Sequence, residues 1–229
     1  MPFLYYDPTF VLLIPAIILA LFAQWRVQST FRHYAAVRAG AGYTGAQVAA
    51  ELLRRQGITD VKIEPISGVL ADHYDPRGKV LRLSPDVYEG DSLAAVGVAA
   101  HEAGHALQHR DGYRPLALRS AIVPAANFGT SAAMILFIIG LFTGATRLMD
   151  LGILFFLGYV MFALITLPVE FNASNRAVAL LQGQGLVLPQ EAQGVRAVLN
   201  AAALTYVAAA TMAILQLVRL LILRNARDD

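Results

Sequence analysis

Residues 151–170 read LGILFFLGYVMFALITLPVE, a run of nineteen residues without Asp, Glu, Lys or Arg that ends at Glu170. A helix of about 20 apolar residues is long enough to cross the hydrocarbon core of a lipid bilayer. The chain contains three more uncharged runs of similar length, at 8–25, 120–146 and 197–218. Together the four runs predict a mainly α-helical integral membrane protein with about four transmembrane helices.

The composition agrees with this prediction and narrows the chemistry. Hydrophobic residues make up 57% of the 229 residues and charged residues 15%, whereas an ordinary soluble domain is about a quarter charged. The net charge of +2 is small and gives no support for nucleic acid binding. The chain has no cysteine, which excludes disulfides, thiolate metal sites and cysteine nucleophiles. Only His, Asp and Glu therefore remain as potential metal ligands.

The first uncharged run has two interpretations. An apolar segment near the N-terminus resembles a signal peptide, but no Lys or Arg precedes it, and Ala23-Gln24-Trp25-Arg26 is not a small-x-small cleavage site. We therefore expect residues 1–25 to form a retained transmembrane anchor.

The distribution of Lys and Arg predicts the orientation of the chain in a membrane. Twelve of the eighteen basic residues lie within residues 26–119, and residues 170–196 hold two more. With four spans these two segments lie on the same side, which the positive-inside rule assigns to the cytoplasm. Arg219, Arg224 and Arg227 oppose this assignment, because they would then lie near the outer face.

Residues 26–119 are the segment long enough to form a sizeable water-facing domain, and their pattern is mixed α and β. Thr44 and Gln47 form a capping-box pattern at the start of a helix that ends near Gly57. A second helix begins after the N-cap Ser92 and continues through His109. Between the helices, short apolar or alternating segments predict a small sheet, with a turn at 75–78 and strands at 61–65, 69–74 and 79–83.

The second helix contains His101-Glu102-Ala103-Gly104-His105, a His-Glu-x-x-His motif. Histidines four residues apart lie on one face of a helix, about 6 Å apart along its axis, so both can bind one zinc ion. Glu102 can then accept a proton from a water molecule that the zinc activates. Such a short pattern also arises by chance, but the small and apolar residues around it predict a buried helix, in which His and Glu need partners.

A catalytic zinc usually has three protein ligands and a water, so a third ligand is expected. His109 lies about 12 Å from His101 along the helix and is too distant, and we interpret it as a surface residue at the helix end. Glu170 is a better candidate, because it ends the run 151–169 on the side of the membrane that carries the motif. His73 is the rival ligand, and Glu170 can instead simply mark the water interface.

The motif at 101–105, followed by Pro168-Val169-Glu170-Phe171-Asn172-Ala173-Ser174 and preceded by Asp72-His73-Tyr74-Asp75-Pro76, resembles the YugP-type membrane zinc metallopeptidases of bacteria. These are similar to the gluzincins, which include HtpX-like and prenyl-protein proteases. The resemblance implies one Zn²⁺ per chain, bound by His101, His105 and Glu170, with Glu102 as the general base. Ser174 stands where HtpX-like relatives carry Asp. The resemblance also implies a gluzincin-like cytoplasmic domain in a protein of the bacterial inner membrane.

The resemblance implies a membrane-embedded endopeptidase. Because the motif lies just before the run 120–146 and Glu170 ends the run 151–169, we expect the active site at the cytoplasmic membrane surface. An edge strand within residues 69–83 can hold an extended peptide through backbone hydrogen bonds, and membrane proteins are among the expected substrates. His73, Tyr74 and Arg176 are candidates for contacts with the substrate or the transition state. The alternative is a non-enzymatic membrane scaffold or metal-binding protein that uses the same ligands structurally. A transporter is disfavoured, because the uncharged runs lack the paired charges expected within its spans.

These interpretations divide the chain into five segments. They are the transmembrane anchor at 1–25, a water-facing metallopeptidase domain with a small β-sheet and the zinc helix at 26–119, two transmembrane helices at 120–169, a second zinc-site segment at 170–196, and a C-terminal transmembrane helix and tail at 197–229.

Overall fold

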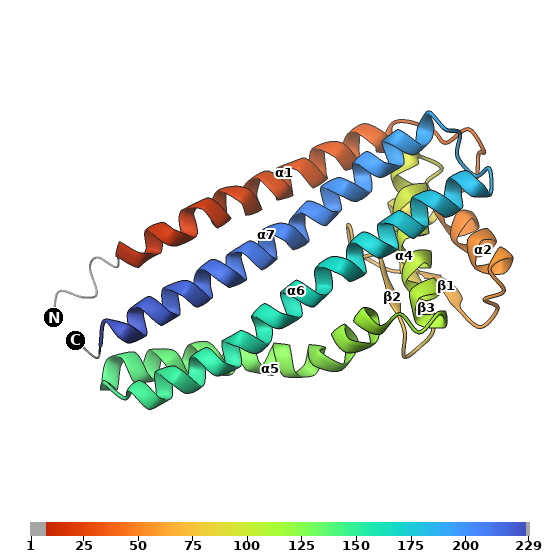
Figure 1. Ribbon diagram of the computed structural model, residues 1–229. Helices are drawn as coiled ribbons and strands as arrows, with labels where there is room; N and C mark the ends of the chain where they lie inside the picture. Colours follow the sequence, from red (N-terminus) through yellow and green to blue (C-terminus); the bar gives the residue numbers. More distant parts are fainter. Residues whose placement is uncertain (1–7, 228–229) are drawn as a thin grey trace. The chain divides into compact units, whose positions relative to one another are not determined.

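The computed structural model describes residues 8–227, except for the side chains of residues 125, 127 and 128, and is mainly helical (Figure 1). Contacts divide the chain into two compact units. Of the described residues, one unit is built from 8–23, 118–167 and 205–227, and the other from 24–117 and 168–204. Each unit therefore combines segments that are far apart in the sequence.

The apolar runs form long helices. The bounds are 3-10 helix η1 Pro8–Leu13 and helices α1 Ile14–Ala35, α5 Arg114–Thr143, α6 Thr146–Gly183 and α7 Glu191–Asn225. Within the described residues, three stretches are long and apolar enough to cross a membrane, and the bent pair within α5 provides a fourth if it counts as one span. Pro124 lies inside α5, where a proline removes a backbone donor and bends a helix. About four spans were expected, so the number agrees.

The first unit exposes large hydrophobic side chains. Leu21, Phe142 and Leu154 have exposed fractions of 67%, 65% and 63%. Its polar contacts include Arg224, which donates from Nε to Asp150 Oδ1 at 2.7 Å. An exposed apolar surface of this extent is unusual for a soluble protein but suits contact with lipid.

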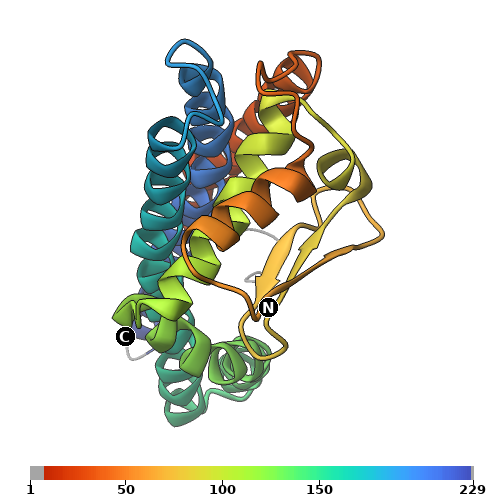
Figure 2. The same cartoon turned by 90° about the vertical axis from the view of Figure 1, so that its right-hand side faces the viewer.

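The second unit contains a small sheet and three further helices, α2 Gly45–Arg55, α3 Pro85–Tyr88 and α4 Leu93–Arg110. The strands are β1 Lys62–Pro65, β2 His73–Asp75 and β3 Val80–Leu83, in the order β1-β3-β2. β1 is parallel to β3, and β2 pairs with β3 as an antiparallel neighbour that leaves β2 at an edge. Figure 2 shows α4 between this sheet and α6. The core of the unit includes Leu52, Leu81, Leu83, Val96, Leu181 and Val195.

The helix ends of this unit follow the predicted signals. Thr44 and Gln47 form both hydrogen bonds of a capping box, and Gly57 after the helix has φ +71°. Ser92 Oγ accepts a hydrogen bond from Ala95 N at 3.2 Å, which confirms it as the N-cap of α4.

One predicted strand was wrong in its first part. The expected strand 69–74 is observed only from His73, as β2. Gly68 and Leu70 have φ +120° and +54°, and this left-handed backbone cannot continue a strand. The apolar residues of this segment are exposed instead of pairing in the sheet, and Val69 is 80% exposed.

Candidate metal centre

The centre is positioned by a close contact between α4 and residues 168–183 of α6. A Cβ added to Gly104 would lie 2.8 Å from the carbonyl oxygen of Ala173 and 3.3 Å from its Cα. Glycine at position 104 therefore lets the two helix backbones approach more closely than any other residue would allow. This approach brings Glu170 of α6 to the face of α4 that carries His101 and His105.

Three potential ligand side chains converge at this contact. His101 Nε2 lies 3.2 Å from Glu170 Oε2, and His105 Nε2 lies 3.6 Å from the same oxygen. One ligand atom from each residue falls within 4.8 Å of the others. The imidazole rings are edge to face, with centroids 4.7 Å apart. The carboxylate of Glu170 is nearly fully buried, at 2% exposure.

The donor set suits a catalytic zinc ion. Two imidazole nitrogens and one carboxylate, with no thiolate available, are a known ligand set of zinc hydrolases, in which a fourth position is left for water. A buried carboxylate is costly unless it is paired with a charge or a metal. The three side chains can therefore hold a metal ion, and the ion would compensate for the burial of Glu170.

The pKa of His105 is set by the burial of its ring and by two nearby carboxylates. Burial lowers the pKa of His105, but the contact with Glu170 and the negative charge of Glu102 raise it by more, so the pKa lies above its ordinary value. A metal ion at Nε2 would take the place of a proton there, since metal binding requires the neutral imidazole.

Both histidines have a hydrogen-bonding partner at the other ring nitrogen. Ser174 Oγ lies 3.1 Å from His101 Nδ1, and Gln108 Oε1 lies 2.9 Å from His105 Nδ1. Such partners orient metal-binding imidazoles. Ser174 thus makes a contact of this kind with its hydroxyl group.

Glu102 lies beside His101 on α4 and is buried, with 8% exposure. It is not among the three residues whose ligand atoms converge. Glu102 therefore lies next to the three-residue group without belonging to it.

His73 and Tyr74 lie on β2 and make contacts outside the three-residue group. His73 Nδ1 lies 2.9 Å from the carbonyl oxygen of Ala71, and His73 Nε2 lies 3.3 Å from an Arg82 guanidinium nitrogen. Tyr74 Oη lies 2.9 Å from His109 Nδ1. Burial raises the pKa of Tyr74 to about 12, with a further contribution from Asp60 and Asp75. Tyr74 therefore keeps its phenolic proton at neutral pH.

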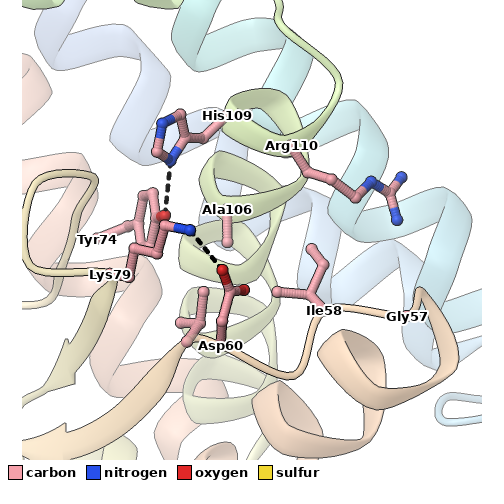
Figure 3. A pocket seen from close by; sticks show the side chains of 9 residues that line it. Gly57, Ile58, Asp60, Tyr74, Lys79, Ala106, His109 and Arg110 are labelled. Carbon is pink, nitrogen blue, oxygen red and sulfur yellow. Dashed lines mark hydrogen bonds and ion pairs between the residues drawn. The ribbon is translucent and has the colours of Figure 1, made fainter.

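The Tyr74–His109 contact borders a pocket between the sheet and α4 (Figure 3). Lys79 forms an ion pair with Asp60 in the same pocket. His109 lies in the last turn of α4, as predicted, and its ring contacts Tyr74 rather than the metal group.

Arg176 lies on α6, one and a half turns beyond Glu170, and contacts three other residues. Its Nε donates to Asn172 Oδ1 at 2.8 Å, and Nη1 donates to Asp111. Its guanidinium carbon is 6.0 Å from the centre of the Tyr113 ring. The ion pair with Arg176 lowers the pKa of Asp111 below its usual range.

Sequence reasoning did not single out Gln108 or Asn172 as part of the site. Gln108 Nε2 donates to the carbonyl oxygen of Val169 at 2.8 Å and to Asn172 Oδ1 at 3.0 Å. A signal was present in the sequence, because Gln108 follows His105 by three residues, and residues three apart are neighbours on the surface of a helix.

Comparisons with known proteins agree with this chemistry. Residues 9–225 match the family described as "putative neutral zinc metallopeptidase". The chain is 48% identical over 219 residues to the "Putative membrane protease YugP" of Bacillus subtilis (strain 168), which covers 95% of this chain and 97% of that protein. No solved structure matches the chain.

Proposed function

Because the chain belongs to the YugP-type family of zinc metallopeptidases, we propose that it is a membrane-embedded, zinc-dependent endopeptidase that hydrolyses peptide bonds with Glu102 as general base. The convergence of His101, His105 and Glu170 in a largely buried group is the observation that carries the proposal.

His101, His105 and Glu170 would hold one zinc ion through Nε2, Nε2 and a carboxylate oxygen. When bound, zinc polarises a water molecule and the scissile carbonyl, and it lowers the pKa of the water toward neutrality. The closed contact between α4 and α6 at Gly104 excludes bulk water from one side of the group.

Glu102 is proposed to move the proton. Its carboxylate accepts a proton from the attacking water and then delivers it to the leaving amine. Its place beside His101 and its low exposure support this role, because a buried carboxylate next to the group is close to the reacting atoms and shielded from bulk solvent.

An extended peptide is proposed to bind along β2. The strand order leaves β2 at the edge of the sheet, and β2 packs against α4, which carries the motif. Backbone pairing with an edge strand tolerates many side chains. His73 and Tyr74 lie on this strand and would contact the substrate. The hydrogen bond of the Tyr74 hydroxyl to His109, outside the three-residue group, disfavours Tyr74 as the donor to the oxyanion. Arg176 is engaged with Asp111 and Asn172, which favours a role in holding these residues in place over direct contact with the substrate.

The proposed location is the bacterial inner membrane, with several spans and the active site facing the cytoplasm. The long apolar helices support the location in a membrane. The concentration of Lys and Arg in residues 26–119 supports a cytoplasmic position for this segment. Glu170 follows the run 151–169 directly, which favours membrane proteins or their cytoplasmic segments as substrates.

Cleavage of an unfolded protein such as casein by detergent-purified protein tests the proposal. We expect chelator-sensitive cleavage by the wild type, and about 10²–10⁴-fold slower cleavage by Glu102→Gln that still binds zinc. Glu64→Gln, an exposed carboxylate on β1, is the control and should cleave as the wild type does. Equal cleavage by Glu102→Gln and wild type would overturn the proposal. Zinc binding without cleavage of any substrate would favour the structural scaffold.

A further inference from the structure

Gln108 is a fully buried polar residue of α4, with 0% exposure, and both ends of its amide are used. Its oxygen lies 2.9 Å from His105 Nδ1, and its nitrogen donates to Val169 and to Asn172 of α6. A buried amide with three partners has a defined direction if one of the partners has a fixed hydrogen-bonding role.

Val169 supplies that fixed role. Its backbone carbonyl can only accept, so the NH₂ end of Gln108 must face it, at 2.8 Å. The opposite end, Oε1, therefore faces His105 Nδ1, and the imidazole must donate. This arrangement selects the His105 tautomer with its proton on Nδ1, which leaves Nε2 to face Glu170.

The partner of His101 does not make this selection. A serine hydroxyl can either donate or accept, so Ser174 Oγ is compatible with both tautomers of His101. Gln108 therefore imposes a direction that Ser174 does not.

The direction of Gln108 is supported further along α6. Asn172 Oδ1 accepts from Gln108 Nε2 at 3.0 Å and from Arg176 Nε at 2.8 Å. Arg176 is in turn held by its ion pair with Asp111. Two donors that converge on one oxygen orient the Asn172 amide, and this oxygen is the second acceptor for Gln108.

We propose that Gln108 is a positioning residue for metal binding. Its neutral amide accepts a hydrogen bond from His105 Nδ1 and so holds His105 with Nε2 directed toward Glu170 and the metal position. This inference rests on the proposed zinc site. It assigns to Gln108, Asn172 and Arg176 a joint role that is separate from contact with the substrate.

Zinc affinity, measured by chelator competition, tests the inference without reference to peptidase activity. Gln108→Leu keeps the size of the side chain but removes the acceptor, and we expect about 10–100-fold weaker zinc binding. Gln108→Glu restores an acceptor for Nδ1 but cannot donate to Val169, so we expect near wild-type zinc affinity with a lower melting temperature of the metal-free protein. The visible spectrum of bound Co²⁺ should change in Gln108→Leu and stay close to the wild type in Gln108→Glu.

Leu107→Ala is the matched control. Leu107 is a buried neighbour of Gln108 on α4 and does not contact His105 through a hydrogen bond, so this variant should lower the melting temperature but keep the zinc affinity. If Gln108→Leu does not fold, Asn172→Ala takes its place, since it removes the second acceptor of Gln108 and should weaken zinc binding by less.

The results separate the two proposals. Wild-type zinc affinity in Gln108→Leu, or equally weak affinity in Gln108→Leu and Gln108→Glu, would show that the amide only ties the helices together and would overturn this inference alone. A wild-type protein that binds no zinc would overturn the proposed function as well.

Discussion

The two halves of α6 have opposite relations between polarity and exposure. Between Leu151 and Leu167 the exposed positions are apolar, such as Leu154 at 63% and Met161 at 48%. After Pro168 two polar side chains on the face toward α4 are buried, Glu170 at 2% and Ser174 at 7%. Lipid favours the first arrangement and a functional site requires the second. One continuous helix therefore serves as a candidate membrane span and as the carrier of a candidate metal ligand.

The largest effect is expected from replacing Glu170, the candidate metal ligand in the second half of α6. Glu170→Gln keeps the shape of the side chain but replaces a carboxylate by a weak ligand, so zinc content should fall from about one per chain to well below that, and cleavage should be lost. Elemental analysis of protein purified without chelator measures this. Glu64→Gln should keep its zinc. Full zinc occupancy in Glu170→Gln would remove Glu170 from the ligands.

A charge introduced into the first half should have the next largest effect. Met161→Lys places an ammonium near the middle of the run 151–169, where a lysine costs about 2.5–3.5 kcal/mol in a transmembrane helix. Ala179→Lys introduces the same charge at an exposed position in the second half and should be tolerated. The measurement is the fraction of each variant that resists alkaline extraction from membranes. Equal fractions for the two variants would contradict a lipid-exposed first half.

A smaller effect on stability is expected from replacing two glycines, one that packs against the second half of α6 and one that lies in its first half. Gly104→Ala would bring a Cβ within 2.8 Å of Ala173 O, opposite the second half of α6, and should destabilise the fold by about 1–3 kcal/mol. Gly158→Ala, in the first half, meets no atom within 4 Å and should leave stability unchanged or slightly higher. Melting temperatures of the metal-free proteins in detergent compare the two. If both variants melt alike, the helix contact is looser than described.

Much of the fold and of the site follows from local patterns. The uncharged runs predicted the long helices because the length of an apolar run sets what can cross a bilayer. The four-residue spacing of His101 and His105 placed both on one face, because the helix repeat is 3.6 residues. Glu170 was a candidate because an ionisable residue at the end of such a run is unusual. These properties depend on residues close together in the chain.

The remaining features depend on contacts between distant segments. The bonds of Gln108 to Val169 and Asn172 exist only because Gly104 lets α4 approach α6. The parallel pairing of β1 with β3 is a long-range choice that alternation of residues does not specify. The positive φ of Leu70, which shortened the predicted strand, is likewise not encoded in its apolar side chain.

The coordination of the bound metal tests the central claim, that His101, His105 and Glu170 together hold a catalytic zinc, most directly. X-ray absorption at the zinc edge of detergent-purified wild-type protein should show two imidazoles and further oxygen ligands, at distances of about 2.0–2.2 Å. Absence of zinc in protein prepared without chelator, or a zinc shell without imidazole, would contradict the account.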